Sequence, residues 1–221
     1  MSIPTKSPGD PGKTRRSHAR ANRARILGAA VTAFVADPDA SMDDVARTAG
    51  VVRRTVYAHF PSREALVEGI ADEASAALVA AMGDEARQPE RPDLAVAVMA
   101  LRTWPIGDRF RMLLSFARRE LGEQRIHDLL GVVRDRDVRV VEHGQRSGVF
   151  SSYLSPSVLV ALAESMTMTL LDQANSGEVQ DSGESFAVAY LAVLGLTPAD
   201  GARVVDEARH WLREHPDVPK S

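Results

Sequence analysis

Residues 41–66 read SMDDVARTAGVVRRTVYAHFPSREAL, and this stretch decides the fold of the chain. Ser41 can cap a first short helix, and the Asp44 carboxylate, three positions later, can complete a capping box by accepting from the backbone N–H of the cap. Gly50 ends that helix, because glycine adopts the left-handed conformation without steric cost. A second helix follows over about residues 53–60 and ends before a proline. Two short helices joined by a glycine turn predict a helix-turn-helix, whose second helix enters the major groove of DNA.

The second helix and its exit carry side chains that suit DNA. Arg53 and Arg54 lie where the helix would enter the groove, and an arginine can bind the O6 and N7 of guanine with two hydrogen bonds. Hydroxyl groups, ring N–H groups and helix N-termini suit phosphates. The predicted DNA contacts are Ser41, Arg53, Arg54, Thr55, Tyr57, His59 and Arg63, with Arg15 and Arg16 from the N-terminal segment. The alternative, a basic surface helix without a ligand, fits an isolated Arg-Arg-Thr sequence better than this complete helix–glycine–helix frame.

The pattern resembles the N-terminal domain of the TetR family of bacterial transcriptional regulators. The residues that carry the resemblance are Ala49, Gly50, Thr55, Tyr57, His59, Phe60, Pro61, Ser62, Arg63 and Glu64. Position 52 departs from the family, because Val52 stands where a serine or threonine usually caps the second helix and touches phosphate. Position 63 is arginine instead of the commoner lysine, which keeps the charge. The resemblance covers about residues 20–68 and implies an all-helical homodimer that binds an operator and responds to a small molecule.

Three segments are expected along the chain. Residues 1–18 are rich in Pro, Gly, Ser and Lys, which predicts a disordered basic arm that either reaches DNA or remains a solvated tail. Residues 19–68 form the predicted DNA-binding head of three to four helices, with an amphipathic helix over residues 20–36 ahead of the motif. Residues 69–221 form a helical domain, to which the resemblance assigns ligand binding and dimerisation.

Charge is distributed unevenly between these parts. Residues 1–63 hold 11 Lys and Arg against 5 Asp and Glu, whereas the remaining residues hold 16 against 25. The formal net charge of −3 therefore conceals a basic head on an acidic body. Nucleic-acid binding needs only the local basic surface, because neutralisation of phosphates drives the affinity.

Composition argues against several other classes of protein. The chain has no cysteine, and its six histidines show no metal-ligand spacing, so neither a metal nor a cofactor is predicted. No recognisable catalytic motif is present, which predicts a protein that is not an enzyme. No apolar run approaches the ~18 residues of a membrane helix, and no signal peptide is visible. A soluble cytoplasmic protein with no membrane partner is the expectation.

Beyond residue 82, turn signals separate six predicted helices. They cover about residues 92–103, 108–120, 123–146, 156–174, 184–194 and 198–214. Strand-like alternation is absent, so the predicted fold class is all-α. Within the third of these helices the run RDRDVR, residues 134–139, predicts a solvated face with local ion pairs.

Two of the predicted helices are apolar nearly all the way round. They contain residues 158–171 and 186–194, and a helix without a polar face must be buried on more than one side. Either they lie wholly inside the subunit or they also contact a second copy, as the resemblance implies. The predicted dimer contacts are Leu159, Leu162, Met166, Leu170, Phe186, Tyr190 and Leu194.

The resemblance also implies a ligand pocket among the remaining helices. The candidate lining residues are Met99, Trp104, Phe110, Phe116, His127, Met166, Met168 and Asp172. Methionine-containing apolar pockets adapt to varied shapes, so a hydrophobic or aromatic effector is expected. Such residues are also ordinary core residues, and a DNA-binding protein without an effector remains the alternative. In the predicted switch, ligand shifts the helix over residues 62–82 and so changes the spacing between the two heads.

Overall fold

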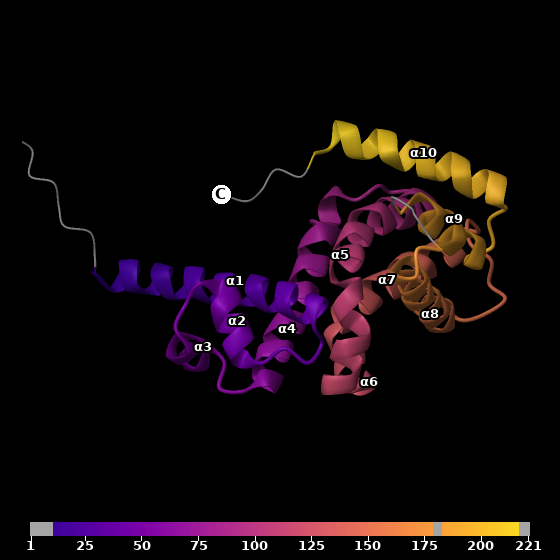
Figure 1. Cartoon of the computed structure of the whole chain (residues 1–221). Helices are drawn as coiled ribbons and strands as arrows, with labels where there is room; N and C mark the ends of the chain where they lie inside the picture. Colours follow the sequence, from indigo (N-terminus) through magenta and orange to yellow (C-terminus); the bar gives the residue numbers. More distant parts are fainter. Residues whose placement is uncertain (1–10, 179–182, 217–221) are drawn as a thin grey trace, which may run out of the picture. The chain divides into compact units, whose positions relative to one another are not determined.

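The computed structural model describes residues 11–178 and 183–216, apart from the side chains of residues 11–17 and 115. Every element in these ranges is helical, which confirms the predicted all-α class. The chain forms two compact units that divide between Ile70 and Ala71. Figure 1 shows the helices, coloured along the sequence. We refer to the first unit as the head and to the second as the body.

The head consists of three helices and the beginning of a fourth. They are α1 (Pro11–Ala36), α2 (Met42–Ala49), α3 (Arg53–His59) and α4 (Arg63–Met82), of which the last continues into the body. Helix α1 packs on α2, and α2 packs on α3. Their apolar faces meet in a buried core that includes Ile26, Leu27, Phe34, Val45, Val56 and Leu66.

The signals in residues 41–66 act as predicted. The Ser41 hydroxyl accepts from the backbone N–H of Asp44, and the Asp44 carboxylate accepts from the backbone N–H of Ser41, so the capping box is complete. The Ser41 hydroxyl also donates to the Asp44 carboxylate at 2.6 Å. This hydrogen bond and the one from the Ser41 backbone N–H lower the pKa of the Asp44 carboxyl below its usual value, because both favour the ionised form. Gly50 ends α2 in the left-handed conformation with φ of 63°. Val52 precedes α3 without a side-chain hydrogen bond, as its apolar side chain requires.

Helix α1 is longer than the predicted helix over residues 20–36. It begins at Pro11, so residues 11–18, expected in the disordered arm, are helical, whereas residues 1–10 lie outside the described part. Proline suits the first position of a helix because its missing N–H has no intrahelical partner there. Residues 13–18 contain neither proline nor glycine, so nothing in them interrupts the helix.

Besides the end of α4, the body contains six α-helices and one short 3₁₀ helix in the described residues. They are η1 (Glu85–Arg87), α5 (Pro92–Leu121), α6 (Glu123–Leu129), α7 (Gly131–Arg146), α8 (Pro156–Asn175), α9 (Glu184–Val193) and α10 (Pro198–Glu214). Helix α10 packs on α5 and α9, while α8 packs on α5, α7 and α9. The predicted bounds of α8, α9 and α10 agree with the structure to within one residue at each end.

Helix α5 corrects the prediction of two helices with a turn around Pro105. The proline lies inside one continuous helix of 30 residues. An internal proline removes a backbone hydrogen bond and costs about 3 kcal/mol. Here the helix is buried on both sides of the proline, with Val96 and Phe116 among its core residues, and Trp104 immediately before the proline is also buried. Packing along the helix therefore offsets the local preference for a turn.

Helices α6 and α7 stand where the sequence predicted one helix over residues 123–146, so this prediction was wrong. The structure separates them at Leu130, whose N–H donates to the carbonyl of Ile126 before α7 begins at Gly131. Glycine weakens a helix by about 1 kcal/mol relative to alanine, and Gly131 marks this break. The break orients α6 independently of α7, and both helices contribute residues to the pocket described below.

Candidate DNA-binding face and ligand pocket

The solvent side of helix α3 presents the residues best placed to contact DNA. Arg53, Arg54 and Tyr57 are exposed, while Val56 on the opposite side is fully buried in the head. This orientation follows from helical spacing, because residues three to four apart share one face. Val52, at the start of the helix, adds an apolar side chain to the exposed side. The geometry agrees with the predicted recognition helix.

Arg53 is already engaged within the head. Its Nη1 donates to Asp43 Oδ2 at 2.9 Å, across the turn from α2. Its guanidinium carbon lies 5.2 Å from the centre of the Tyr57 ring, and Nη2 lies 3.4 Å from the Tyr57 hydroxyl. The hydrogen bond with Tyr57 and the charge of Asp43 raise the pKa of Arg53 above its usual value. The contacts with Asp43 and Tyr57 restrain the Arg53 side chain, which remains exposed.

The remaining predicted DNA contacts either are less exposed or already have hydrogen-bond partners within the head. Thr55 and His59 are half-buried at the edges of the exposed face. The Ser41 hydroxyl is engaged in the capping box, so its role in the free protein is to begin α2. The side chains of Arg15 and Arg16 lie outside the described part of the chain.

The half-buried Arg63 is occupied by contacts within the head, whereas the sequence predicted a contact to phosphate. Its two terminal nitrogens donate to the carbonyl oxygens of Ala40 and Pro38, in the loop between α1 and α2. Its guanidinium also lies 4.6 Å from the centre of the Phe34 ring, in a cation–π contact. We therefore assign Arg63 a structural role. The sequence offered no signal for this, since both carbonyls come from residues more than 20 positions away.

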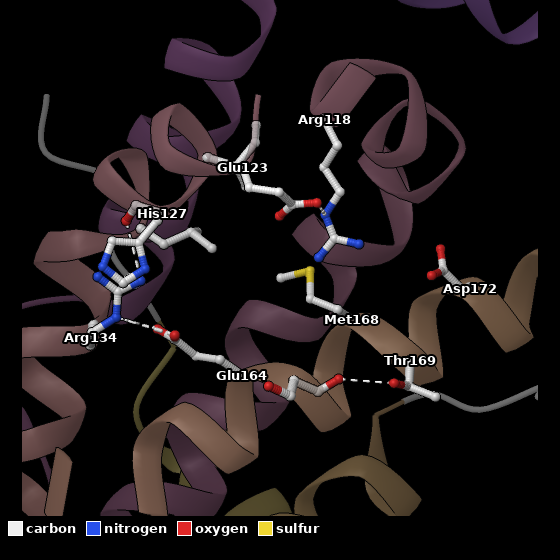
Figure 2. Close-up of a pocket in the computed structure, with 11 residues that line it drawn as sticks. Arg118, Glu123, His127, Arg134, Glu164, Met168, Thr169 and Asp172 are labelled. Carbon is white, nitrogen blue, oxygen red and sulfur yellow. Dashed lines mark hydrogen bonds and ion pairs between the residues drawn. The ribbon is translucent and has the colours of Figure 1, made fainter. Parts of the chain in front are cut away.

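A pocket of about 330 Å³ lies in the body among α5, α6, α7 and α8 (Figure 2). Its lining residues are Arg118, Glu123, Ile126, His127, Leu130, Arg134, Glu164, Ser165, Met168, Thr169 and Asp172. Only Ile126, Leu130 and Met168 among them are apolar. The remaining eight side chains are charged or polar, which makes this a polar site.

Two arginines in the pocket differ in how firmly they are paired. Arg134 lies 3.0 Å from the Glu164 carboxylate and also donates to the backbone carbonyl of His127, so its charge is well compensated. The Nε of Arg118 lies 3.5 Å from Glu123 and is buried without a hydrogen bond in the described part of the chain. Figure 2 shows the guanidinium of Arg118 pointing toward the sulfur of Met168. Arg118 is thus the less compensated cation of the pair.

The structure places only part of the predicted ligand set at this pocket. His127, Met168 and Asp172 line it. Trp104, Met99 and Phe116 are buried core residues, and Trp104 stacks on Phe186 with ring centres 5.3 Å apart. Phe110 and Met166 are half-buried and do not line this pocket. The sequence-based prediction missed Arg118, Arg134 and the α8 hydroxyls, because charged residues in helices usually indicate solvated faces.

The run at residues 134–139 is tied into the body, which corrects the expected solvated face. Asp137 is buried and accepts from the Tyr190 hydroxyl at 3.2 Å, while its Oδ1 has no hydrogen-bond partner in the described residues. Burial raises the pKa of Asp137 to about 7, and the Glu164 charge adds to the effect, against lowering contributions from Tyr190 and Arg136. Burial and the neighbouring Asp137 raise the pKa of Tyr190 well above its usual value. Asp135 is the exposed carboxylate of this run.

The predicted dimer contacts also separate into buried and accessible residues. Leu159, Phe186, Tyr190 and Leu194 lie in the core of the body and have little exposed surface, and their place in an interface stays a prediction. Met166 and Leu170 are half-buried against the same core. Leu162 is exposed on α8, together with Val158. Tyr153 and Leu154, just before this helix, add exposed apolar surface nearby along the chain.

Two further classes of site bear on the function of the chain. No helix in the described residues combines the length and the hydrophobicity that crossing a bilayer needs. No group of three or more histidine, aspartate or glutamate side chains in those residues is arranged to hold a metal ion.

Comparison with known proteins finds relatives of the head. A model of the bacterial regulatory proteins of the tetR family matches residues 26–70. An uncharacterized HTH-type transcriptional regulator of Pseudomonas putida, TtgW, is 41% identical over 56 residues. That match spans 24% of this chain and 42% of the relative, which is less than half of the relative's length.

Solved structures share the fold of the chain more completely. RolR in complex with resorcinol has a TM-score of 0.60 at 17% identity, over 93% of this chain and 98% of that one. FadR of Bacillus subtilis with stearoyl-CoA has a TM-score of 0.69 at 13% identity, over 78% and 97%. LfrR of Mycobacterium smegmatis with proflavine has a TM-score of 0.62 at 17% identity, over 81% and 99%.

These likenesses agree with the local geometry of the head. The region that the family model matches contains the capped α2, the turn at Gly50, and α3 with its exposed arginines. At identities below 25%, the structural likeness of the remaining chain shows the fold alone. The helix-turn-helix head of this chain is thus similar to that of the bacterial regulatory proteins of the tetR family, over residues 26–70.

Proposed function

We propose that the protein is a homodimeric transcriptional repressor that binds an operator and leaves it when a small molecule binds the body. The observation that carries the proposal is the exposed face of α3, where Arg53, Arg54 and Tyr57 point to solvent from a basic head. Arginine recognises guanine in the major groove and also binds phosphate, so this face can supply both affinity and specificity.

Operator selection from random duplex DNA, read at low and high salt, tests this proposal. We expect an enriched palindrome whose half-sites lie one helical turn apart, about 34–36 Å, as the two heads of a dimer require. Arg53→Ala and Arg54→Ala should each weaken operator binding by ~1–3 kcal/mol where the residue contacts guanine. Salt-sensitive binding with no enriched sequence would contradict the proposal and support a DNA-binding protein without sequence preference.

The pocket supports a response to a small molecule and suggests the chemistry of that molecule. A purely hydrophobic ligand would remove water from Arg118 and its charged neighbours without replacing their hydrogen bonds, which is unfavourable. The polar lining therefore favours a polar effector over the hydrophobic or aromatic one predicted from the sequence. RolR, FadR and LfrR were solved with resorcinol, stearoyl-CoA and proflavine, so ligands of varied chemistry occur on this fold.

A thermal-stability screen of small carboxylates, amines and neutral phenols tests the effector proposal. A true ligand should raise the melting temperature of the wild type and release it from its operator. Arg118→Gln should reduce that shift, whereas Arg146→Gln, the same charge change at an exposed position outside the lining, should not. A ligand that binds equally well to both variants would show that this pocket is not its site.

Contacts within the body suggest how the pocket would affect the head. Helix α6 lines the pocket through Ile126 and His127, and it contacts the later part of α4. The Ser75 hydroxyl of α4 donates to the Leu129 carbonyl at 2.7 Å. Asp72 of α4 pairs with Arg125 of α6 at 3.2 Å. Ligand that displaces α6 would therefore displace α4, the helix that also contributes to the head.

Measurement of the coupling between the two sites tests this route. Coupling free energies between effector and operator are typically ~1–3 kcal/mol. Ser75→Ala should reduce the effect of ligand on operator affinity while leaving the affinity for ligand nearly unchanged. The matched control is Ser147→Ala at the end of α7, because the Ser147 hydroxyl donates to the His143 carbonyl of that same helix and lies outside the pocket lining. Unchanged coupling in Ser75→Ala would exclude this contact from the mechanism.

The exposed apolar side chains of α8 support the proposed dimer. Val158 and Leu162 share one exposed face of the helix, four residues apart. A second copy that packed its own α8 there would cover both side chains by twofold symmetry. Leu162→Glu should shift the protein from dimer to monomer in analytical ultracentrifugation. Val132→Glu, at another exposed apolar position, is the matched control, and equal effects would argue against an α8 interface.

A further inference from the structure

Adjacent arginines on α3 differ in how freely they move. Arg53 is held on two sides, by the Asp43 carboxylate at 2.9 Å and by the ring of Tyr57 at 5.2 Å. Arg54 is exposed, and it has no hydrogen-bond or ion-pair partner among the residues that the structure describes. The side chain of Arg53 nevertheless remains 64% exposed, so the contacts restrain it without covering it.

Restraint has a direct consequence for reading a base. An arginine that binds guanine with two hydrogen bonds must align its planar group with O6 and N7, and a free side chain loses rotamer freedom when it does so. Asp43 engages Nη1 of Arg53, and the Tyr57 hydroxyl lies 3.4 Å from Nη2. A guanidinium has five N–H donors, so three remain for the base. Much of the ordering is thus completed before DNA arrives, which lowers its entropic cost on binding.

The charge of Asp43 acts in the same direction. Non-specific affinity comes from the neutralisation of phosphates by cations, and it does not depend on sequence. The Asp43 carboxylate offsets the charge of Arg53 and so weakens its attraction to any phosphate. A hydrogen bond to guanine depends on geometry as well as charge, and it is therefore weakened less.

We propose that Asp43 is a positioning residue for operator specificity, which holds Arg53 with Tyr57 for a guanine while the free Arg54 binds phosphate. This inference rests on the DNA-binding function proposed above. Asp43 belongs to α2, the helix that crosses the DNA backbone in such motifs, and its partner belongs to the recognition helix. The ion pair thus joins the two helices of the motif at the face that meets DNA.

The test compares Asp43→Asn with Asp39→Asn. Both variants remove one negative charge from the head, and Asp39 lies in the exposed loop before α2, away from the contacts of Arg53. The measured quantity is the ratio of the Kd for a random duplex to the Kd for the selected operator, at one salt concentration. We expect this ratio to fall about 3- to 10-fold in Asp43→Asn, the range for ordering one long side chain, and to stay near the wild-type value in Asp39→Asn.

Base analogues then locate the contact. Arg53→Ala identifies the guanine that Arg53 reads, and an operator with 7-deazaguanine at that position lacks the N7 acceptor. Wild-type protein should lose affinity for this operator, and Asp43→Asn should lose less because its Arg53 is less well ordered. Arg54→Ala should weaken binding to operator and random duplex by similar factors, as a phosphate contact does.

Different outcomes would overturn the positioning role of Asp43 and the proposed operator binding. Equal specificity ratios in Asp43→Asn and Asp39→Asn would exclude positioning by Asp43. An altered preference at a base other than the Arg53-dependent guanine would show that Asp43 touches DNA itself, which also overturns the proposal. If the wild type selects no sequence at all, the proposed operator binding fails first. Circular dichroism of each variant confirms that the head is folded.

Discussion

Asp137 should make the stability of the body depend on pH. Its carboxyl is buried beside Tyr190, and burial raises its pKa from 3.8 to about 7. Between these two values the folded protein retains a proton that the unfolded chain releases. The free energy of unfolding therefore falls as pH rises through this window, and it levels off above about pH 7.

The size of the effect follows from the width of the window. One proton bound in the folded state and released in the unfolded state changes the free energy of unfolding by ~1.4 kcal/mol per pH unit. From about pH 5 to about pH 8 the titration of Asp137 should therefore remove up to ~3 kcal/mol. Asp137→Asn cannot ionise, so its stability relative to the wild type should increase by that amount between the two pH values.

Urea unfolding at fixed protein concentration, followed by tryptophan fluorescence, measures this difference. Both tryptophans, Trp104 and Trp211, lie in the body, so the signal reports on the unit that contains Asp137. Asp135→Asn is the control, because Asp135 is an exposed carboxylate on the same helix. Parallel pH dependences for wild type and Asp137→Asn would refute the reasoning. So would an equal change in Asp135→Asn, since that would indicate a general effect of net charge.

Three further parts of the structure are open to test by substitution. Arg63→Met leaves the carbonyls of Pro38 and Ala40 without their partner and should destabilise the head by about 1–3 kcal/mol. Amide hydrogen exchange in α2 should then be faster than in the wild type. Unchanged exchange would contradict a structural role for Arg63. Gly144→Ala should destabilise the body by about 1–3 kcal/mol in urea unfolding, because a Cβ would overlap the buried Phe150 ring. Gly131→Ala, where a Cβ meets no atom, should instead stabilise it by up to about 1 kcal/mol, and the same sign in both variants would argue against a steric cause. Ser41→Ala should lower the free energy of unfolding of the head by about 1 kcal/mol, because α2 loses its cap. If DNA affinity falls by more than the loss of folded protein explains, Ser41 also contacts DNA.

The head could be predicted from the sequence because its signals are local. The capping pair Ser41 and Asp44 lies within one turn of helix, and Gly50 sets the turn by its own backbone preference. These interactions need no distant partner, so sequence spacing determines them. Arg63 shows where this reasoning ends, because its partners lie in the loop before α2 and become neighbours only in the folded head.

Predictions for the body were weaker for the same physical reason. Pro105 indicates a turn locally, yet α5 continues through it because of packing on both sides. Apolar side chains such as Trp104 were candidates for ligand contact, and they lie in the core instead. Spacing alone cannot distinguish a core face from a pocket face, since both are buried. Arg118 and Arg134 line the pocket through contacts between helices that are far apart in sequence.

The contacts that Arg63 makes with the loop before α2 have a consequence for the thermodynamics of DNA binding. Each phosphate that a protein neutralises on duplex DNA releases about 0.9 of a condensed cation, and this release sets the dependence of affinity on ionic strength. A tally of basic side chains in the motif would include Arg63, although its guanidinium is occupied by carbonyl oxygens of the head. Each head should therefore release about one cation fewer than that tally implies. Occupancy of the operator would then vary less steeply with the salt content of the cell than the charge of the motif suggests.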